Sequence, residues 1–359
     1  MPILNVTPKY TYKDLTIVPS EISSIRSRKQ CIPFDKEGYL PLFTAPMPTV
    51  VDNSNFQLFE DNKIHTVLPR TEDLDVRLEH SKKLFSAFSL QEFENNFIRK
   101  LDEKRYVLID IANGHMRSLY SVVEESKKIN GKNICIMIGN IANPNTYEYC
   151  VRCGVDYVRV SIGTGSMCLT TTSVSVHYPI ASLINEINQI KRKLLNEGIG
   201  KEALTKVVAD GGIRDYSDII KALALGADYV MCGFVFAKML ESAAKIKIIQ
   251  KASSKLSDEE ILNDNELLKT FLLEKKIYKD FFGMSTKKAQ KMMHKDNLTT
   301  SEGVERKITV DYTMKGWIEN FNDYLRSAMS YCNASKLEDF IGKPTLIPIS
   351  SNSFNLIDK

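Results

Sequence analysis

The segment Asp156-Tyr157-Val158-Arg159-Val160-Ser161-Ile162-Gly163-Thr164-Gly165-Ser166-Met167-Cys168-Leu169-Thr170 joins an apolar run to a loop that contains two glycines and a cysteine. The run at 156–160 predicts a short buried strand, and Gly163 and Gly165 can adopt backbone angles that other residues avoid. They would let main-chain groups approach a bound ligand or a cation. A thiolate at Cys168 could attack a ligand bound over the end of the strand. The alternative is that Cys168 is one more small apolar residue.

Short apolar runs alternate with helix-like segments along most of the chain, and eight of them have the length of a strand. Most are rich in Val, Ile and Phe and lack regular apolar–polar alternation, which is typical of parallel strands buried on both faces. The eight runs are residues 40–45, 64–68, 84–88, 106–111, 134–138, 156–160, 206–209 and 228–232. Eight successive strand–helix units predict an α/β fold, the TIM (β/α)8 barrel.

Helix-end signals lie between several of these runs. Pro144 can begin a helix that Gly154 ends. The acidic stretch that starts at Asp215 can begin another helix, which Gly226 ends. These signals support the alternation of strands and helices.

Glycines and polar residues gather directly after the predicted strands. They are Pro46-Met47 after the first strand, Asn113-Gly114-His115 after the fourth, Gly139-Asn140 after the fifth, the cysteine-containing loop after the sixth, Asp210-Gly211-Gly212 after the seventh and Gly233 after the eighth. In TIM barrels the carboxyl ends of the strands carry the active site. We therefore expect these residues to share one rim of the barrel.

The chain of 359 residues is expected to form one catalytic barrel domain, with the barrel at about 38–240. Beyond the barrel we expect an added helical layer at 241–276 and an active-site flap at 283–303. An amphipathic helix, near 317–331, and a polar tail are expected within 315–359. The flap contains Lys287, Lys288, Lys291 and Lys295, which either approach a bound cofactor or are simply solvated.

Composition excludes several classes of function. The chain has 48 basic and 44 acidic side chains, a formal charge of +4, and no long basic run with interleaved aromatic residues, so nucleic-acid binding is not expected. It has neither a hydrophobic leader with a cleavage site nor an apolar run of membrane-spanning length. We expect a cytoplasmic protein without membrane contacts.

The seven cysteines do not form the pattern of a disulfide framework. They are scattered over positions 31, 135, 150, 153, 168, 232 and 332, which fits a reducing compartment. Cys150 and Cys153 have CxxC spacing, but no second pair lies where a zinc site would need it. We expect that pair to be structural, at the end of a helix.

From residue 12 to residue 341 the chain resembles the IMP dehydrogenase and GMP reductase family of purine nucleotide oxidoreductases. No single motif is specific, but their order and their positions after successive strands are. The matching stretches are Tyr12-Lys13-Asp14, Ala45-Pro46-Met47, Asp110-Ile111-Ala112-Asn113-Gly114-His115, Gly139-Asn140, Ile162-Gly163 with Cys168 and Thr170, Ala209-Asp210-Gly211-Gly212-Ile213, Phe282-Gly283-Met284-Ser285 and Ser301-Glu302-Gly303.

The resemblance implies a covalent mechanism. Cys168 would add to C2 of the purine base and form a thioimidate. Thr170 and Glu302, the latter from the flap, would handle proton transfer. By itself Glu302 would be a solvated surface carboxylate, but the flanking Ser301 and Gly303 match the family pattern and favour the catalytic role.

The resemblance also implies binding roles. Nucleotide-binding residues would be Met47, Asn140, Ser166, Asp210, Gly211, Gly212, Gly233, Phe234, Gly283 and Met284, with Asp210 on the ribose and the glycine amides on the 5′-phosphate. Core packing is the alternative for Met47 and Met284. Cofactor-binding residues would be Asp110, Asn113, Gly114 and Gly163, with Asp110 on the nicotinamide ribose. A monovalent cation, K⁺, would bind backbone groups of Gly163, Gly165 and Cys168.

Several positions depart from the family pattern and leave the substrate open. They are Pro48, Ser161, Thr164, Thr171, Thr172 and Phe234. Each could reshape phosphate or cofactor binding without removing the chemistry at Cys168.

Three absences favour GMP reductase, which would use NADPH to convert GMP to IMP and ammonia, over IMP dehydrogenase, which oxidises IMP to XMP with NAD. Residues 283–302 contain neither arginine nor tyrosine, the flap is short, and no regulatory CBS-type insert follows residues 64–66. Against this, Ala45-Pro46-Met47 is the dehydrogenase-like form. A paralogue that only binds purine nucleotides is a further alternative, although it would need none of the three catalytic residues. The resemblance also implies a homotetramer.

Overall fold

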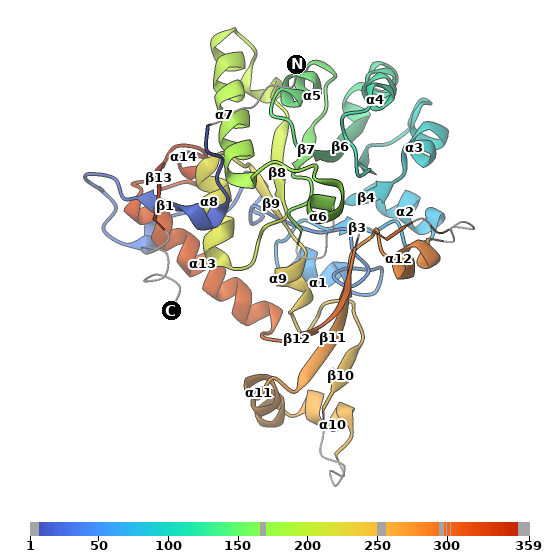
Figure 1. The fold of residues 1–359 in the computed structure, drawn as a ribbon, viewed down its shortest axis with the longest axis vertical. Helices are drawn as coiled ribbons and strands as arrows, with labels where there is room; N and C mark the ends of the chain where they lie inside the picture. Colours follow the sequence, from blue (N-terminus) through green and yellow to red (C-terminus); the bar gives the residue numbers. More distant parts are fainter. Residues whose placement is uncertain are drawn as a thin grey trace.

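The computed structural model describes residues 7–165, 170–249, 256–293, 298, 300–301 and 303–350, in which parallel strands form a barrel inside a ring of helices (Figure 1). Its strands are β2 (Leu42–Thr44), β3 (Val67–Leu68), β4 (Phe85–Phe88), β5 (Arg105–Asp110), β6 (Ile134–Ile141), β7 (Tyr157–Val160), β8 (Lys206–Asp210) and β9 (Tyr229–Cys232). They are hydrogen-bonded in the order β2-β9-β8-β7-β6-β5-β4-β3. A parallel bridge between Phe43 and His65 joins the two edges of the sheet. The predicted TIM barrel is confirmed.

The helices that follow the strands cover the outside of the barrel (Figure 1). They are α1 (Phe56–Asp61), α2 (Leu74–His80), α3 (Leu90–Phe97), α4 (Arg117–Asn130), α5 (Thr146–Arg152), α7 (Ile180–Asn196), α8 (Tyr216–Leu225) and α9 (Phe234–Ala237). The short helix α6 (Thr170–Val174) belongs instead to the loop after β7, where its Thr171 hydroxyl donates to the carbonyl of Gly163. Helix α8 has both predicted ends. The Asp215 carboxylate accepts hydrogen bonds from the amides of Ser217 and Asp218, and Gly226 ends the helix with a φ of +117°.

The strands carry apolar side chains on both faces, one packed against the outer helices and one inside the barrel. Along β7, Val158 and Val160 are fully buried against the outer helices, while Tyr157 packs inside the barrel. Inside, Phe43 meets Phe85, Tyr157 and Tyr229 in edge-on contacts with ring centroids 5.8, 5.9 and 5.2 Å apart. These side chains fill the barrel, so a ligand has room only above the strand ends.

A repeated lysine–aspartate pair braces two halves of the barrel at the amino-terminal ends of its strands. Asp156, before β7, accepts hydrogen bonds from Lys127 of α4 (2.5 Å) and from the amide of Ile136 in β6 (2.6 Å). Asp228, before β9, accepts from Lys191 of α7 (2.5 Å) and from the amide of Val207 in β8 (2.7 Å). Each pair therefore fixes one strand against its neighbour and against the helix before that neighbour.

Residues 241–276 are not simply the helical layer that the sequence predicts. Helices α10 (Asp258–Asn263) and α11 (Asn265–Leu273) are present, but the segment also contains strand β10 (Ile246–Ile248). That strand pairs antiparallel with β11 (Ile277–Phe282), which pairs with β12 (Glu305–Thr309). The alternation Ile246-Lys247-Ile248 has the period of a strand and is too short to stand out among lysine-rich residues. The sheet and the two helices form an arm that projects from the barrel (Figure 1).

The predicted flap lies in the connection from β11 to β12 and includes helix α12 (Lys287–Met292). The predicted C-terminal helix is α13 (Met314–Tyr331), capped by Thr313, and α14 (Leu337–Phe340) follows it. The sequence-based prediction missed that the two ends of the chain meet, because β1 (Leu15–Val18) pairs antiparallel with β13 (Thr345–Pro348). Single turns of 3₁₀ helix complete the described structure: η1 (Tyr12–Asp14), η2 (Arg28–Gln30), η3 (Gly131–Asn133) and η4 (Lys201–Ala203). Among the described helices, none has the length and apolar character needed to cross a membrane.

Candidate functional site

A cavity of about 380 Å³ lies over the carboxyl ends of the barrel strands. Most of the residues expected to bind nucleotide or cofactor line it, although they are far apart in the sequence. They are Met47, Asp110, Asn140, Gly163, Asp210, Gly211, Gly233, Phe234, Gly283 and Met284, and Gly165, expected at the cation site, also lines the cavity. The barrel rim and the flap thus contribute to one cavity, as the positions of these residues after successive strands predict.

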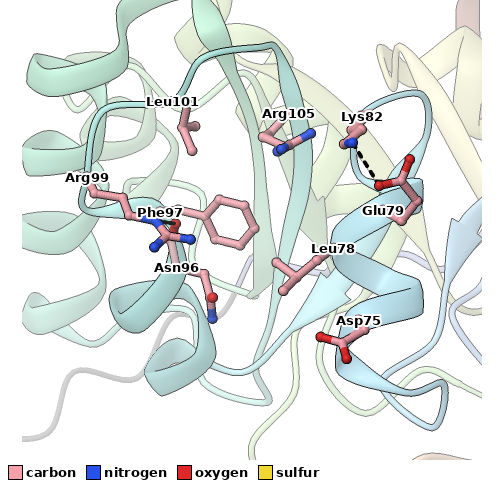
Figure 2. Close-up of a pocket in the computed structure, with 9 residues that line it drawn as sticks. All are labelled: Asp75, Leu78, Glu79, Lys82, Asn96, Phe97, Arg99, Leu101 and Arg105. Atoms are coloured by element: carbon pink, nitrogen blue, oxygen red, sulfur yellow. Dashed lines mark hydrogen bonds and ion pairs between the residues drawn. The ribbon is translucent and has the colours of Figure 1, made fainter.

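A second hollow, of about 270 Å³, lies on the opposite side of the strands, between α2, α3 and the start of β5. Figure 2 shows its charged side chains around the apolar Phe97, Leu78 and Leu101, with Lys82 paired to Glu79 at 2.7 Å. It lies at the amino-terminal ends of β4 and β5. In barrels of this kind that end serves stability, so we take the cavity over the carboxyl ends as the candidate site.

Arg159 is at the centre of the candidate site. It lies near the end of β7, points into the barrel and is only 8% exposed. Its Nη1 donates to Oδ1 of Asp110 at 2.6 Å, and its Nη2 donates to Oδ2 of Asp210 at 2.8 Å. Burial alone would lower the pKa of Arg159, but the two carboxylates together raise it, so the guanidinium remains charged.

Gly139 at the end of β6 makes room for this arginine. Its φ is +148°, and a Cβ at this position would lie 2.5 Å from Cβ of Arg159. The next residue, Asn140, donates from Nδ2 to Oδ2 of Asp210 at 2.8 Å. The predicted Gly139-Asn140 motif therefore places one small residue beside the arginine and one amide on the carboxylate.

The motif that follows β5 joins two rim loops. Gly114 donates its amide to the carbonyl of Asn140 at 2.8 Å, and a Cβ on Gly114 would lie 2.7 Å from that oxygen. His115 accepts the Ala142 amide at Nε2 and so donates from Nδ1 to Thr146. Burial lowers the pKa of His115, which keeps the ring neutral. The expected cofactor residues Asn113 and Gly114 do not line the cavity, and the contacts of Gly114 fix the loop of Asn140.

The described part of the cysteine loop is held by hydrogen bonds from three directions. The Thr171 hydroxyl donates to the carbonyl of Gly163 at 2.7 Å, and His177 Nδ1 lies 3.0 Å from the carbonyl of Ile162. The Gly212 amide donates to the carbonyl of Thr164 at 3.2 Å. These contacts hold residues 162–165 across the ends of β7 and β8.

Four expected site residues lack a described side chain. Ser166, Cys168 and Glu302 lie outside the described residues, and for Thr170 only the backbone, at the start of α6, is described. The structure does describe residues close to Cys168 and Glu302 in the sequence, since Gly165 lines the cavity and Gly303 is the last residue of the flap.

The glycines expected to bind phosphate differ in their surroundings. Gly211 and Gly233 line the cavity, whereas Gly212 lies against Tyr12 and Ile180 and its amide is already bonded to Thr164. A Cβ on Gly233 would lie 3.2 Å from the sulfur of Met47. Backbone amides for an anion would therefore come from Gly211 and Gly233 rather than from all three glycines.

The flap side of the cavity is built on β11. Phe234 tilts against Phe281 with the ring centroids 5.8 Å apart, and both rings line the cavity together with Gly283 and Met284. Thr286 caps α12 by accepting the amide of Ala289. The departure from the family pattern at Phe234 thus places an aromatic ring where the barrel meets the flap.

A cation site is only partly described. The carbonyl of Gly163 already accepts the Thr171 hydroxyl, and Cys168, the third expected ligand, lies outside the described residues. Among the described residues, no group of three or more His, Cys, Asp or Glu side chains could hold a metal ion. The donors needed for K⁺ are backbone oxygens, so the prediction for this site stays open.

The surroundings of Cys150 and Cys153 favour a structural role for the CxxC pair. Burial raises the pKa of the Cys150 thiol to about 12, and the Cys150 sulfur lies 3.9 Å from the hydroxyl of Tyr120. Burial and a hydrogen bond to Glu124 raise the pKa of the Cys153 thiol to about 12. At neutral pH both thiols stay protonated and unreactive.

Sequence reasoning missed Arg159 and Arg70. Arg159 interrupts a buried apolar strand, and a charge there needs a buried partner, which is the signal that could have identified it. Arg70 follows β3, lines the cavity and donates to the carbonyl of Asp110 at 3.4 Å. Its Nε is buried with no hydrogen-bond partner.

Comparisons with known proteins agree with the family that the sequence motifs indicate. Residues 81–258 match the sequence profile of the IMP dehydrogenase / GMP reductase domain. The chain is 27% identical to GMP reductase of Staphylococcus epidermidis over 92% of this chain and 93% of the relative. It is 26% identical to GMP reductase of Staphylococcus carnosus, over 96% and 98%, and 25% identical to GMP reductase of Bacillus subtilis, over 91% and 92%. The similarity thus spans the barrel, the flap and the C-terminal helix.

Proposed function

Because the chain belongs to the IMP dehydrogenase and GMP reductase family, we propose that it is a GMP reductase, which converts GMP to IMP and ammonia with NADPH. The observation that carries this proposal is the pair of carboxylates, Asp110 and Asp210, on either side of Arg159. Each has one oxygen bound to Arg159, and among the described residues its other oxygen has no hydrogen-bond partner. A carboxylate with a free oxygen can accept hydrogen bonds from ribose hydroxyls.

Two such carboxylates suit two ribosides bound side by side, a mononucleotide and a nicotinamide dinucleotide. Asp210 lies beside Gly211, one of the glycines proposed to bind the phosphate of the nucleotide, so it would bind the ribose of GMP. Asp110 lies beside Ile111 and Ala112, which also line the cavity, and would bind the nicotinamide ribose. The residues present therefore fit both ligands, and the reduced nicotinamide would supply the hydride.

The proposed chemistry uses the residues of the cysteine loop and the flap. The Cys168 thiolate adds to C2 of GMP, and the C2 amino group leaves as ammonia, so the nucleotide becomes a thioimidate on the sulfur. Thr170 and Glu302 would deliver the proton that the leaving amine needs. The hydride that the reduced nicotinamide would supply at C2 would break the carbon–sulfur bond, so that the Cys168 thiolate is regenerated and IMP is released. The sum is GMP, NADPH and two protons to IMP, NADP⁺ and ammonium.

The flap favours reduction over oxidation. A dehydrogenase must hydrolyse the covalent intermediate, and the resemblance assigns that step to an arginine and a tyrosine in a long flap. This connection from β11 to β12 is short and has neither residue between 283 and 302. The dehydrogenase-like Ala45-Pro46-Met47 segment, in which Met47 lines the cavity, keeps IMP dehydrogenase as the second candidate.

An absorbance assay at the nicotinamide wavelength separates the two activities. With GMP and NADPH the absorbance should fall as NADPH is consumed, and IMP and ammonium should appear in equal amounts. With IMP and NAD⁺ the absorbance should stay constant. A rise in the second mixture and no change in the first would reverse the assignment.

Cys168→Ala tests the covalent step. Turnover should be lost, whereas the affinity for GMP should stay within a few-fold, because the proposed ribose and phosphate contacts come from other loops. An electrophilic purine nucleotide should label the wild-type thiol. Full turnover by the variant would reject the nucleophile, and a wild-type thiol that stays unlabelled would favour a protein that only binds nucleotides.

A further inference from the structure

We propose that Arg159 is a positioning residue that couples the nucleotide subsite to the cofactor subsite, because one guanidinium holds an oxygen of each ribose-binding carboxylate. This inference rests on the proposed function, which assigns Asp210 to the ribose of GMP and Asp110 to the ribose of the dinucleotide. It adds an energetic link between the two ligands.

The contacts divide each carboxylate into a held oxygen and a free one. Oδ2 of Asp210 accepts from Nη2 (2.8 Å) and Nε (3.1 Å) of Arg159 and from Nδ2 of Asn140 (2.8 Å). Oδ1 of Asp110 accepts from Nη1 of Arg159 (2.6 Å). Oδ1 of Asp210 and Oδ2 of Asp110 have no partner among the described residues. Both carboxylates line the cavity, where the free oxygens are available to a ligand.

The arginine has little freedom to serve the two carboxylates separately. Its side chain is 10% exposed, and those of Asp110 and Asp210 are 15% and 17% exposed. Gly139 approaches so closely that a Cβ there would overlap Cβ of Arg159. Because the guanidinium is planar and its donors are fixed relative to one another, the orientation of one carboxylate constrains that of the other.

A coupling free energy follows from this shared contact. When a ribose hydroxyl donates to the free oxygen of Asp210, that carboxylate and the guanidinium lose freedom together. Asp110 is then already oriented for the second ribose, so binding of the second ligand costs less side-chain conformational entropy. By linkage the effect is reciprocal: the cofactor must tighten nucleotide binding by the same factor. A lysine at position 159 has one ammonium and cannot hold both carboxylates in this geometry.

Binding measurements with GMP and NADP⁺ test the inference, since NADP⁺ has no hydride to transfer and the pair does not react. By titration calorimetry, saturating NADP⁺ should lower the Kd of wild-type protein for GMP by about fivefold or more. We define the coupling ratio as the Kd for GMP without NADP⁺ divided by the Kd for GMP with saturating NADP⁺. In Arg159→Lys this ratio should fall to about one. Arg77→Lys is the matched control, because Arg77 is also buried and holds the carboxylate of Glu92 at 2.7 Å, but does not line the cavity. Its ratio should stay at the wild-type value.

A second variant keeps the test valid if Arg159→Lys folds poorly. Asp110→Asn should also bring the ratio to about one when NADP⁺ is present at a concentration that saturates the variant, because the amide replaces the carboxylate that Arg159 holds on the cofactor side. An unchanged ratio in both variants, or a ratio of one in the wild type, would overturn the coupling. Turnover of GMP with NADPH on the same wild-type preparation separates the two claims. Turnover without coupling rejects the coupling alone, and its absence rejects the proposed function.

Discussion

Arg159 and Lys279 are both almost fully buried, and different partners stabilise their positive charges. Arg159 is held by two carboxylates at the ligand cavity. Lys279 of β11 instead donates to the carbonyls of Leu240 (2.7 Å) and Ser242 (2.6 Å) and to the Ser242 hydroxyl (2.8 Å). A carboxylate partner stabilises the charge fully, whereas carbonyl dipoles do so only in part. Burial therefore lowers the pKa of Lys279 to about 8.

Gly139→Ala should disrupt the site from its centre. The added Cβ would lie 2.5 Å from Cβ of Arg159, on a backbone whose φ of +148° disfavours any side chain. We expect a loss of about 1–3 kcal/mol in the free energy of unfolding and a large fall in kcat/KM for GMP. Gly200→Ala is the control, because Gly200 has a φ of −62° and open space around it. Equal stability of the two variants in thermal denaturation would refute the close approach.

Lys279 should make stability depend on pH in the alkaline range. Its pKa is about 8 in the folded chain and 10.5 when solvated, so between these values only the unfolded chain binds the proton. Stability from this group therefore rises as the pH rises from 8 to 10.5, on the order of 3 kcal/mol in total. Lys279→Met should lose that rise relative to wild type in denaturant unfolding. Lys247→Met, at a half-exposed lysine of the same sheet, should keep it.

At the scale of elements, the arm and the flap share strands. β11 carries Lys279, which joins it to the loop that follows α9, and Phe281, which lines the cavity. The flap leaves from the end of β11 and returns into β12, so the arm sheet is its base. Within the flap, Lys288 lies 3.8 Å from Asp280 and over the ring of Phe282, both residues of β11. This lysine is therefore bound to the base of the flap.

The contacts of Lys288 narrow down which flap lysines are available to select NADPH over NADH. Of the flap lysines, Lys287 and Lys291 have no ion-pair partner among the described residues, and their ammonium groups could approach the 2′-phosphate of NADPH. Replacing both by serine should lower kcat/KM for NADPH about tenfold and leave that for NADH nearly unchanged. Lys288→Ser is the matched control and should affect both cofactors equally. A parallel fall for NADPH and NADH in the double variant would mean that the flap lysines are only solvated.

At the scale of the whole molecule, apolar side chains remain exposed where the N-terminal segment meets the end of α13. Ile22 is 83% exposed and Tyr331 is 66% exposed, and the amide of Ser20 donates to the carbonyl of Tyr331. Close by, β1 and β13 form a two-stranded sheet on the outside of the barrel (Figure 1). Large exposed apolar side chains are common at surfaces that contact another protein, so this surface is a candidate for self-association.

We expect a homotetramer in solution, as the family resemblance implies. Light scattering under assay conditions should give about four times the 40.7 kDa of one chain. Ile22→Ser combined with Tyr331→Ser should lower the mass if this surface is part of the assembly. A wild-type mass of one chain would contradict the tetramer, and an unchanged mass in the double variant would place the interface elsewhere.

Local sequence patterns determined the barrel and most of the rim. Eight apolar runs of strand length, helix signals such as Asp215 and Gly226, and glycine motifs after the strands are all short-range features. The strand period and the common rim of a (β/α)8 barrel convert them into positions in space. This is why Asp110, Asn140 and Asp210 could be expected at one cavity before any contact was known.

Only the tertiary structure decided what those residues touch. Arg159 meets Asp110 and Asp210 across about fifty residues of chain on either side. The pairing of β1 with β13 brings segments near the two ends of the chain together. Residues 246–248 form the strand β10 because they pair with the edge of β11. Such contacts depend on which surfaces meet after the chain has folded, and the local periodicity of apolar residues in the sequence does not predict them. The shared arginine, on which the proposed coupling depends, is therefore a property of the fold.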